Sequence, residues 1–313
     1  MARSLGYRDY GTYLEEIFPC KVQKLAINAG FTCPNRDGSK GVGGCTYCNN
    51  QTFNPGYCAP HLSVSEQIEE GKAFFRKKYP AMKYLAYFQA YTNSYGDIDS
   101  LMSLYKEAIA CDDVVGLVIG TRPDCVPQQL LERLARLDCY AMIEYGAESS
   151  HDATLNLINR CHGWGDTVDA VMRTSSLGIA TGLHLILGLP GESREMMVQT
   201  VQRLSQLPVA TIKFHQLQLI KGTRMAHDVQ QGVYDIPRFT AEEYIDLCAD
   251  LLQYLRDDIA VERFASQSPE ELLLWPKWGL KNYQFTNLLI NRLDKLGICQ
   301  GALYKKSIEK SML

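Results

Sequence analysis

Stretches of consecutive apolar residues alternate along the chain with segments whose apolar residues recur at helical spacing. The apolar stretches predict strands, and the helical spacing predicts amphipathic helices between them. The predicted strands cover residues 22–29, 83–91, 114–120, 140–146, 179–189 and 210–220. The predicted helices cover residues 63–78, 98–110, 127–137, 194–207 and 241–256, with further helix before residue 177.

Strands separated by helices of about ten residues or more favour right-handed β-α-β units in one parallel sheet. Six such units, counted from the strand at residues 22–29, describe an α/β fold, an incomplete (β/α)6 TIM-like barrel. We expect residues 22–258 to form this barrel and residues 259–313 to form a C-terminal extension with a helical pattern up to Leu296. Residues 1–21 have a partly helical spacing and are interpreted as a lid or a packing segment.

Composition is that of an ordinary globular chain. Of the 313 residues, 46% are hydrophobic and 21% are charged, and the net charge is −3 with a pI near 6.1. This balance gives no electrostatic argument for nucleic acid over the whole surface, so an RNA substrate would need a local basic patch. The chain offers no secretory signal and no apolar run of about 18 residues. With an odd count of eleven cysteines, these features predict reduced thiols, a cytoplasmic location and no membrane association.

A loop rich in Gly, Pro and Asn follows the first strand and carries three cysteines. Cys33, Cys45 and Cys48 have the spacing Cys-x11-Cys-x2-Cys, which lets a flexible backbone turn several sulfur atoms toward one metal centre. A cubane cluster held by three thiolates leaves one iron open for a substrate or cofactor. The alternative is a structural zinc site, in which Cys58 would supply the fourth sulfur.

Polar and Gly-rich segments recur where the predicted strands end. They cover residues 89–93, 121–124, 146–148, 188–192 and 221–222. In barrels of this kind the loops at the carboxyl ends of the strands carry the functional groups, so these segments are expected to converge on one rim. Such convergence favours a reactive metal centre over zinc that only braces the fold.

Several motifs resemble one known family. The cysteine loop, with Pro34, Asn35, Arg36 and Gly44 in place, is similar to the cluster loop of radical S-adenosylmethionine (SAM) enzymes. The likeness is greatest to the YhcC/YtqA family, which is related to the catalytic subunit of Elongator. Further matching strings occur in order at residues 87–92, 120–127, 158–160 and 184–192. The resemblance implies a radical SAM partial barrel with a [4Fe–4S] cluster on Cys33, Cys45 and Cys48 and with SAM on its open iron. The cluster would cleave SAM to a 5′-deoxyadenosyl radical.

The resemblance also implies contacts to SAM, and each has packing or bracing as its alternative. Tyr47 falls where an aromatic residue lies near adenine, and Gln89 falls where polar groups lie near the methionine amine. Glu148 and His184 match ribose contacts, and Arg160 matches a clamp on the SAM carboxylate. The Gly-Leu-Pro-Gly-Glu turn at residues 188–192 is expected to approach the sulfonium end of SAM. The sequence assigns no residue to the catalytic step.

The substrate is the open question. Likeness to Elongator, whose family modifies wobble uridine, suggests tRNA, and an electron donor such as flavodoxin or ferredoxin is expected as a partner. Modest basic runs occur at residues 76–78, at Lys277 and Lys281, and at residues 305–306. A small-molecule or protein substrate is the alternative within enzymes, and a non-enzymatic zinc- or cluster-bearing binding module is the alternative from another class. In the tail, Ala-Ser-Gln at residues 265–267 departs from the Thr-Gly-Asp of close relatives.

Overall fold

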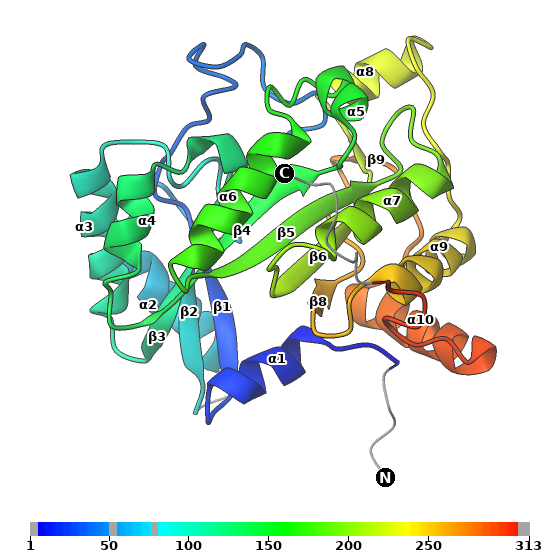
Figure 1. Cartoon of the computed structure of the whole chain (residues 1–313). Helices are drawn as coiled ribbons and strands as arrows, with labels where there is room; N and C mark the ends of the chain where they lie inside the picture. The colour runs from blue at the N-terminus through cyan, green and yellow to red at the C-terminus, as the bar shows by residue number, and fades with distance from the viewer. Residues whose placement is uncertain (1–5, 50–54, 77–80, 306–313) are drawn as a thin grey trace.

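One curled sheet of parallel strands forms the centre of the molecule (Figure 1). The computed structural model describes residues 6–49, 55–76 and 81–305. Its main sheet has the order β1-β2-β3-β4-β5-β6-β8, and every neighbouring pair is parallel. The strands are β1 (Val22–Ile27), β2 (Lys83–Phe88), β3 (Val114–Thr121), β4 (Tyr140–Glu148), β5 (Ala180–Leu187), β6 (Thr211–Gln216) and β8 (Ala260–Arg263). The predicted partial barrel is therefore confirmed.

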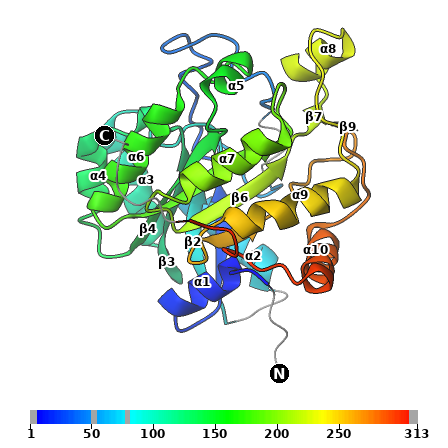
Figure 2. The same ribbon diagram turned by 45° about the vertical axis from the view of Figure 1, so that its right-hand side comes forward.

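Helices cover the outer face of the sheet, and Figure 2 shows α6, α7 and α9 following one another across it. The helices of this layer are α2 (Val64–Arg76), α3 (Ile98–Ile109), α4 (Gln128–Leu134), α6 (Trp164–Ser176), α7 (Arg194–Leu204) and α9 (Ala241–Tyr254). Helix α5 (Asp152–Leu157) lies at the top of Figure 1, beside the cysteine loop. Side-chain caps start several of them: Asp97 accepts from the Ser100 N–H before α3, and Ser193 accepts from the Met196 N–H before α7. Among the described residues, no helix is long and apolar enough to span a bilayer.

Alternation along each strand separates the core from the barrel interior. Phe88, Ile143 and Leu185 face the helices and are at most 1% exposed. Burying each such side chain contributes about 1.5–3 kcal/mol. Their neighbours Glu144 and His184 point the opposite way, because successive side chains on a strand face opposite sides of the sheet. The sequence thereby places polar groups inside the barrel while its outer face stays apolar.

The sheet gains a seventh strand that the sequence analysis did not predict. Strand β8 lies within the range assigned to the C-terminal extension and pairs in parallel with β6. With only four residues, β8 is too short to stand out by periodicity. Helix α10 (Asn282–Leu296) then packs against α9, in agreement with the helical pattern up to Leu296. The domain boundaries themselves stay a prediction.

Residues 210–220 form two strands instead of the single one predicted. Strand β6 ends at Gln216, and β7 (Leu219–Ile220) pairs antiparallel with β9 (Leu273–Trp275) in a separate sheet. The Gln216 amide ends the strand because its Oε1 accepts from the Ser266 N–H at 2.7 Å and its Nε2 donates to the Ser266 carbonyl at 2.8 Å. Helix α8 (Arg224–Gln230), which was also not predicted, begins at the cap Thr223.

The N-terminal segment closes the barrel at the end away from the cysteine loop. Helix α1 (Tyr10–Ile17) lies below the strands in Figure 1, whereas the loop after β1 lies at the top. The Tyr13 hydroxyl lies 3.0 Å from that of Tyr140, and Leu14 joins a small apolar cluster at this end. Of the two roles left open by the sequence, packing is the one that this position fits.

A network of buried charges fills the middle of the barrel. Lys24 Nζ lies 2.5 Å from one Glu144 oxygen, and Lys213 Nζ lies 2.6 Å from the other. Glu262 pairs with both lysines, at 3.1 Å from Lys213. Although burial opposes ionisation of Glu144, the charges of Lys213 and Lys24 hold its pKa well below the usual value. The four side chains come from β1, β4, β6 and β8.

Substitution of Glu144 tests the contribution of this network to stability. Glu144→Gln keeps the shape of the side chain but removes the charge that compensates Lys24 and Lys213, and breaking a buried pair typically costs about 3–5 kcal/mol. We expect the free energy of unfolding, measured by urea denaturation, to fall by about that amount. The matched control Glu132→Gln, on the exposed face of α4, should change it by less than about 0.5 kcal/mol. An equal free energy of unfolding for the two variants would contradict the proposed contribution of the network to stability.

Candidate functional site

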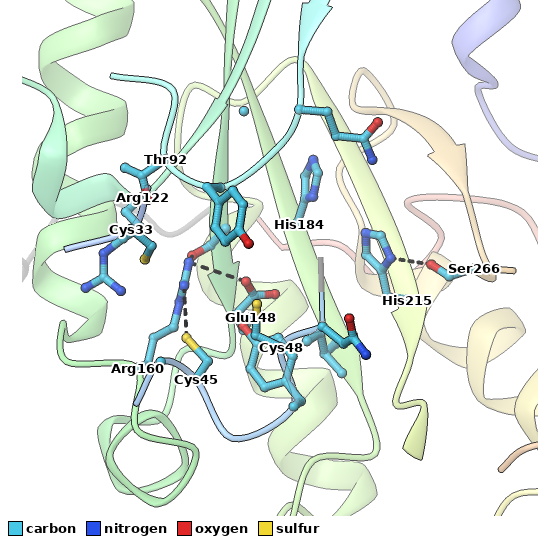
Figure 3. A pocket seen from close by; sticks show the side chains of 18 of the residues that line it. Cys33, Cys45, Cys48, Thr92, Arg122, Glu148, Arg160, His184, His215 and Ser266 are labelled. Carbon is cyan, nitrogen blue, oxygen red and sulfur yellow. Dashed lines mark hydrogen bonds and ion pairs between the residues drawn. The ribbon is translucent and has the colours of Figure 1, made fainter. Parts of the chain in front are cut away.

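The cysteine loop turns back on itself above the carboxyl ends of the strands. The Arg36 N–H donates to the Cys33 carbonyl at 2.8 Å, and the Cys48 N–H donates to the Cys45 carbonyl at 3.0 Å. Gly44 is required between these turns, because its φ is +76° and an added Cβ would lie 2.9 Å from Arg36 Nε. The result is that Cys33, Cys45 and Cys48 all line one pocket that continues into the barrel (Figure 3).

The segment after α5 fastens this loop. Asn159 Nδ2 donates to the Gly44 carbonyl at 2.8 Å, and Asn35 Nδ2 donates to the Asn159 carbonyl at 2.6 Å. The Thr46 N–H donates to the Ile158 carbonyl at 3.0 Å. These bonds explain why the strings at residues 33–48 and 158–160 occur together, since the second string holds the first in place.

A buried guanidinium faces one of the three thiols. Arg160 Nη1 donates to Cys45 Sγ at 3.4 Å, while Nη2 lies 2.6 Å from the Gly146 carbonyl and 3.4 Å from Glu148 Oε1 (Figure 3). Arg160 Nε is buried and has no partner among the described residues. A positive donor beside a sulfur stabilises its thiolate form. Arg160, the predicted ligand of the SAM carboxylate, is thus held in position by contacts within the protein. Its contact with SAM stays a prediction.

The environment of Cys48 disfavours its thiolate form unless a positively charged group is bound beside it. Burial raises the pKa of the Cys48 thiol to about 11, and the charge of a Cys45 thiolate adds to this effect. Thiolates that line one pocket repel one another, and an iron–sulfur cluster bound to them would supply the compensating positive charge. The residues present fit a [4Fe–4S] cluster held by Cys33, Cys45 and Cys48.

The four-thiol zinc alternative has no support in the structure. Cys58 is buried in the barrel wall, where its Sγ donates to the Ala26 carbonyl at 2.8 Å, and it is not among the residues that line the pocket. In the described part of the chain, no group of three or more His, Cys, Asp or Glu side chains is arranged to hold a single metal ion. Cys58 is therefore a structural thiol.

The structure brings all five predicted SAM contacts to the pocket of the three thiols. Tyr47, Gln89, Glu148, Arg160 and His184 line it together. His184 Nε2 lies 3.0 Å from Glu144 Oε2, and burial, with the nearby charge of Lys213, lowers the pKa of the histidine. The ring is therefore neutral at pH 7. Whether each side chain contacts SAM stays a prediction.

The turn at residues 188–192 lies beside the pocket wall, and its approach to SAM stays a prediction. None of these residues lines the pocket. Glu192 instead accepts a short hydrogen bond from the Ser149 hydroxyl, and an added Cβ on Gly188 would lie 3.3 Å from Phe239. The turn leads from the carboxyl end of β5 to α7, and its Leu189 packs in the apolar cluster that also contains Ile186 and Tyr47 of the pocket wall.

Arg122 is a site residue that the sequence analysis did not single out. It lines the pocket at 2% exposure and forms two hydrogen bonds to the Asp124 carboxylate, at 2.9 and 3.1 Å. Although burial opposes ionisation, these bonds lower the pKa of Asp124. Its position directly after the strand-ending Gly-Thr pair was the available signal. His215, Arg263 and Ser266 also line the pocket, from the wall that includes β6 and β8.

Known proteins are similar to this chain in sequence. A family model described as the Radical SAM superfamily matches residues 30–204, and one described as the Radical_SAM C-terminal domain matches residues 209–295. YtqA of Bacillus subtilis is 34% identical over 311 residues, which cover 98% of this chain and 95% of YtqA. YhcC of Escherichia coli K12 is 35% identical over 301 residues, which cover 94% of each chain.

More distant matches link the fold to proteins with larger chains. The tRNA uridine(34) acetyltransferase of Methanocaldococcus infernus is 23% identical over 187 residues, which cover 59% of this chain and 34% of that protein. The solved structure of archaeal Elp3 from M. infernus superimposes with a TM-score of 0.67 at 18% identity, over 90% of this chain and 64% of that one. At this identity the match shows the fold alone. The family models and the two relatives YtqA and YhcC identify the chain as a radical SAM enzyme of the YhcC/YtqA family.

Proposed function

We propose that the chain cleaves SAM reductively in the pocket below the cysteine loop and directs the resulting radical at a uridine of tRNA. The observation that carries the first part is the convergence of Cys33, Cys45 and Cys48 on the pocket that also contains the predicted SAM contacts. When bound there, a [4Fe–4S] cluster supplies the electron that breaks the sulfonium–carbon bond of SAM. An external donor such as flavodoxin or ferredoxin would provide that electron.

The protein's own residues hold and enclose the cofactor. Arg160 keeps the Cys45 sulfur oriented, and Gln89 and Glu148 offer hydrogen-bonding groups at the ends of β2 and β4. Tyr47 is partly buried against an apolar cluster that includes Leu189 and Leu217 and so closes one side of the pocket. This enclosure limits the access of water and of stray hydrogen donors to the reacting groups.

The tRNA part of the proposal is supported by the relatives and by the mouth of the pocket. One matching protein is a tRNA uridine(34) acetyltransferase. At the mouth, the exposed residues Arg36 and Lys221 belong to segments that meet, since Asn49 Nδ2 lies 3.4 Å from the Lys221 carbonyl. Cations at this rim suit a phosphate backbone, whose contacts position an RNA without reading its sequence.

The first basic run noted in the sequence does not lie at this rim. Arg76 ends α2, which runs opposite to the strand before it, so it lies at the amino end of the sheet, away from the pocket. Lys77, Lys78 and Lys306 lie outside the described residues. The net charge of −3 favours the alternative of a small-molecule or protein substrate.

Cysteine substitutions test the assignment of the cluster. Cys33→Ala, Cys45→Ala and Cys48→Ala should each abolish SAM cleavage, because each removes one of three ligands that the cluster requires. The measurement is the yield of 5′-deoxyadenosine after anaerobic reconstitution and addition of dithionite. A wild-type protein that releases none would leave the binding-module alternative standing.

Cys58→Ala is the matched control for those substitutions. It also removes a thiol but should leave both iron content and 5′-deoxyadenosine yield near the wild-type values, because the Cys58 thiol donates to the Ala26 carbonyl and does not line the pocket. Equal loss of iron from Cys58→Ala would restore the four-thiol zinc model.

Nucleoside analysis tests the proposed substrate. We expect tRNA from a strain that lacks the gene to lose one modified uridine, detected by mass spectrometry of total nucleosides, and to regain it when the wild-type gene is supplied. Supply of the Cys48→Ala variant should not restore it. An unchanged nucleoside profile would favour the small-molecule or protein substrate.

A further inference from the structure

The wall of the pocket across from the thiols carries a positive charge that the protein does not neutralise. Figure 3 shows His184, His215 and Ser266 on the side away from Cys33 and Cys45. Arg263, the last residue of β8, lines the same pocket and is partly buried. Within the described residues, no carboxylate lies within 4 Å of its guanidinium, which sets Arg263 apart from Arg122 and Arg160.

The contacts of Arg263 leave part of its hydrogen-bonding capacity unused. Its Nη2 lies 3.4 Å from Nδ1 and 3.5 Å from Nε2 of His215. A nitrogen nearly equidistant from both ring atoms cannot lie along the lone pair of either. Arg263 Nε is buried without a partner among the described residues, and a buried donor without an acceptor destabilises the fold. An oxyanion bound to the guanidinium would offset this cost.

Nearby carboxylates are already committed to other cations. Glu262, next to Arg263 in sequence, pairs with Lys24 and Lys213, and Glu144 pairs with the same two lysines. Two acidic and two basic groups thus cancel in the barrel interior. Burial, with the charge of Arg263 next in weight, holds the pKa of His215 well below its usual value, so the histidine adds no charge. The guanidinium is left as the excess charge of this wall.

The groups around Arg263 are held in fixed positions. The Ser266 hydroxyl forms a short hydrogen bond with His215 Nδ1. Ser266 is fastened in turn by both ends of the Gln216 amide, and Gln218 Nε2 donates to its carbonyl at 3.2 Å. A rigid first layer of this kind holds a ligand without further loss of side-chain entropy.

We infer that Arg263, with His215 and Ser266 beside it, forms a subsite for an anionic group of the substrate, either a carboxylate or a phosphate. The guanidinium presents a planar fork of N–H donors that matches both oxyanions. Because neutral His215 and Ser266 are hydrogen-bonded to each other, the pair keeps one donor for the anion, an N–H or an O–H, and adds no opposing charge. The inference deepens the proposed function and rests on it in one respect, namely that the substrate reacts in this pocket.

Anion binding can be measured without turnover and without knowing the substrate. The full-length, cluster-loaded protein with SAM bound is titrated calorimetrically with inorganic phosphate and, separately, with acetate. We expect saturable binding of at least one of them, and the tighter binder indicates whether the substrate carries a phosphate or a carboxylate. Arg263→Met should weaken that binding at least tenfold. The control Arg133→Met, which removes an arginine paired with Asp99 on the outer helices, should not change it.

The outcomes separate this inference from the proposed function. Wild-type affinity in a folded Arg263→Met variant, or no binding of either anion by the wild type, would overturn the subsite. If Arg263→Met loses its cluster or its thermal transition, Arg263→Gln takes its place with the same expected loss, and unchanged affinity there is equally decisive. Release of 5′-deoxyadenosine is measured on the same wild-type sample. Its absence would contradict the proposed function while the anion-binding result stands.

Discussion

The buried pairing of Lys24, Glu144, Lys213 and Glu262 is the interaction on which the rest of the structure depends. Strands β1 and β8 are the two ends of an open sheet, and no ladder of backbone hydrogen bonds joins them to each other. The ion pair between Lys24 and Glu262 crosses that opening with side chains. Because a buried charge is costly without a partner, each of the four side chains determines where the other three can lie. The curvature that forms a pocket above them follows from this arrangement.

The same layer separates two environments inside the barrel. Below it, tyrosines and leucines from α1 and the strands make an apolar plug. Above it, the pocket holds histidines, glutamines and the three thiols. A radical enzyme needs both properties, since the plug excludes solvent from one end and the polar walls orient a cofactor from the other. The family assignment and the interior of the barrel therefore agree on the physical requirement.

Local patterns in the sequence predicted most of the fold, whereas long-range pairings did not show in it. The near-continuous apolar runs form the predicted strands, and the three cysteines of the Cys-x11-Cys-x2-Cys spacing line one pocket, while their role as metal ligands stays a prediction. Strand β8 was missed because four residues carry too little periodicity. The bond of Arg160 to the Cys45 sulfur joins residues far apart in sequence, and no pattern along the chain could reveal it. The contact of Arg263 with His215 did not show in the sequence for the same reason.

The anchoring of the cysteine loop by the segment after α5 has a consequence for the order in which the enzyme is built. Asn159 and Gly44 are 115 positions apart, and the Met225 N–H at the start of α8 donates to the carbonyl of Thr46 in the same loop. The ribosome therefore releases the thiols long before it releases the residues that aim them. The cysteine loop can take its final shape for binding iron and sulfide only after most of the polypeptide has been synthesised. We therefore expect the metal centre to mature only after synthesis has passed the start of α8.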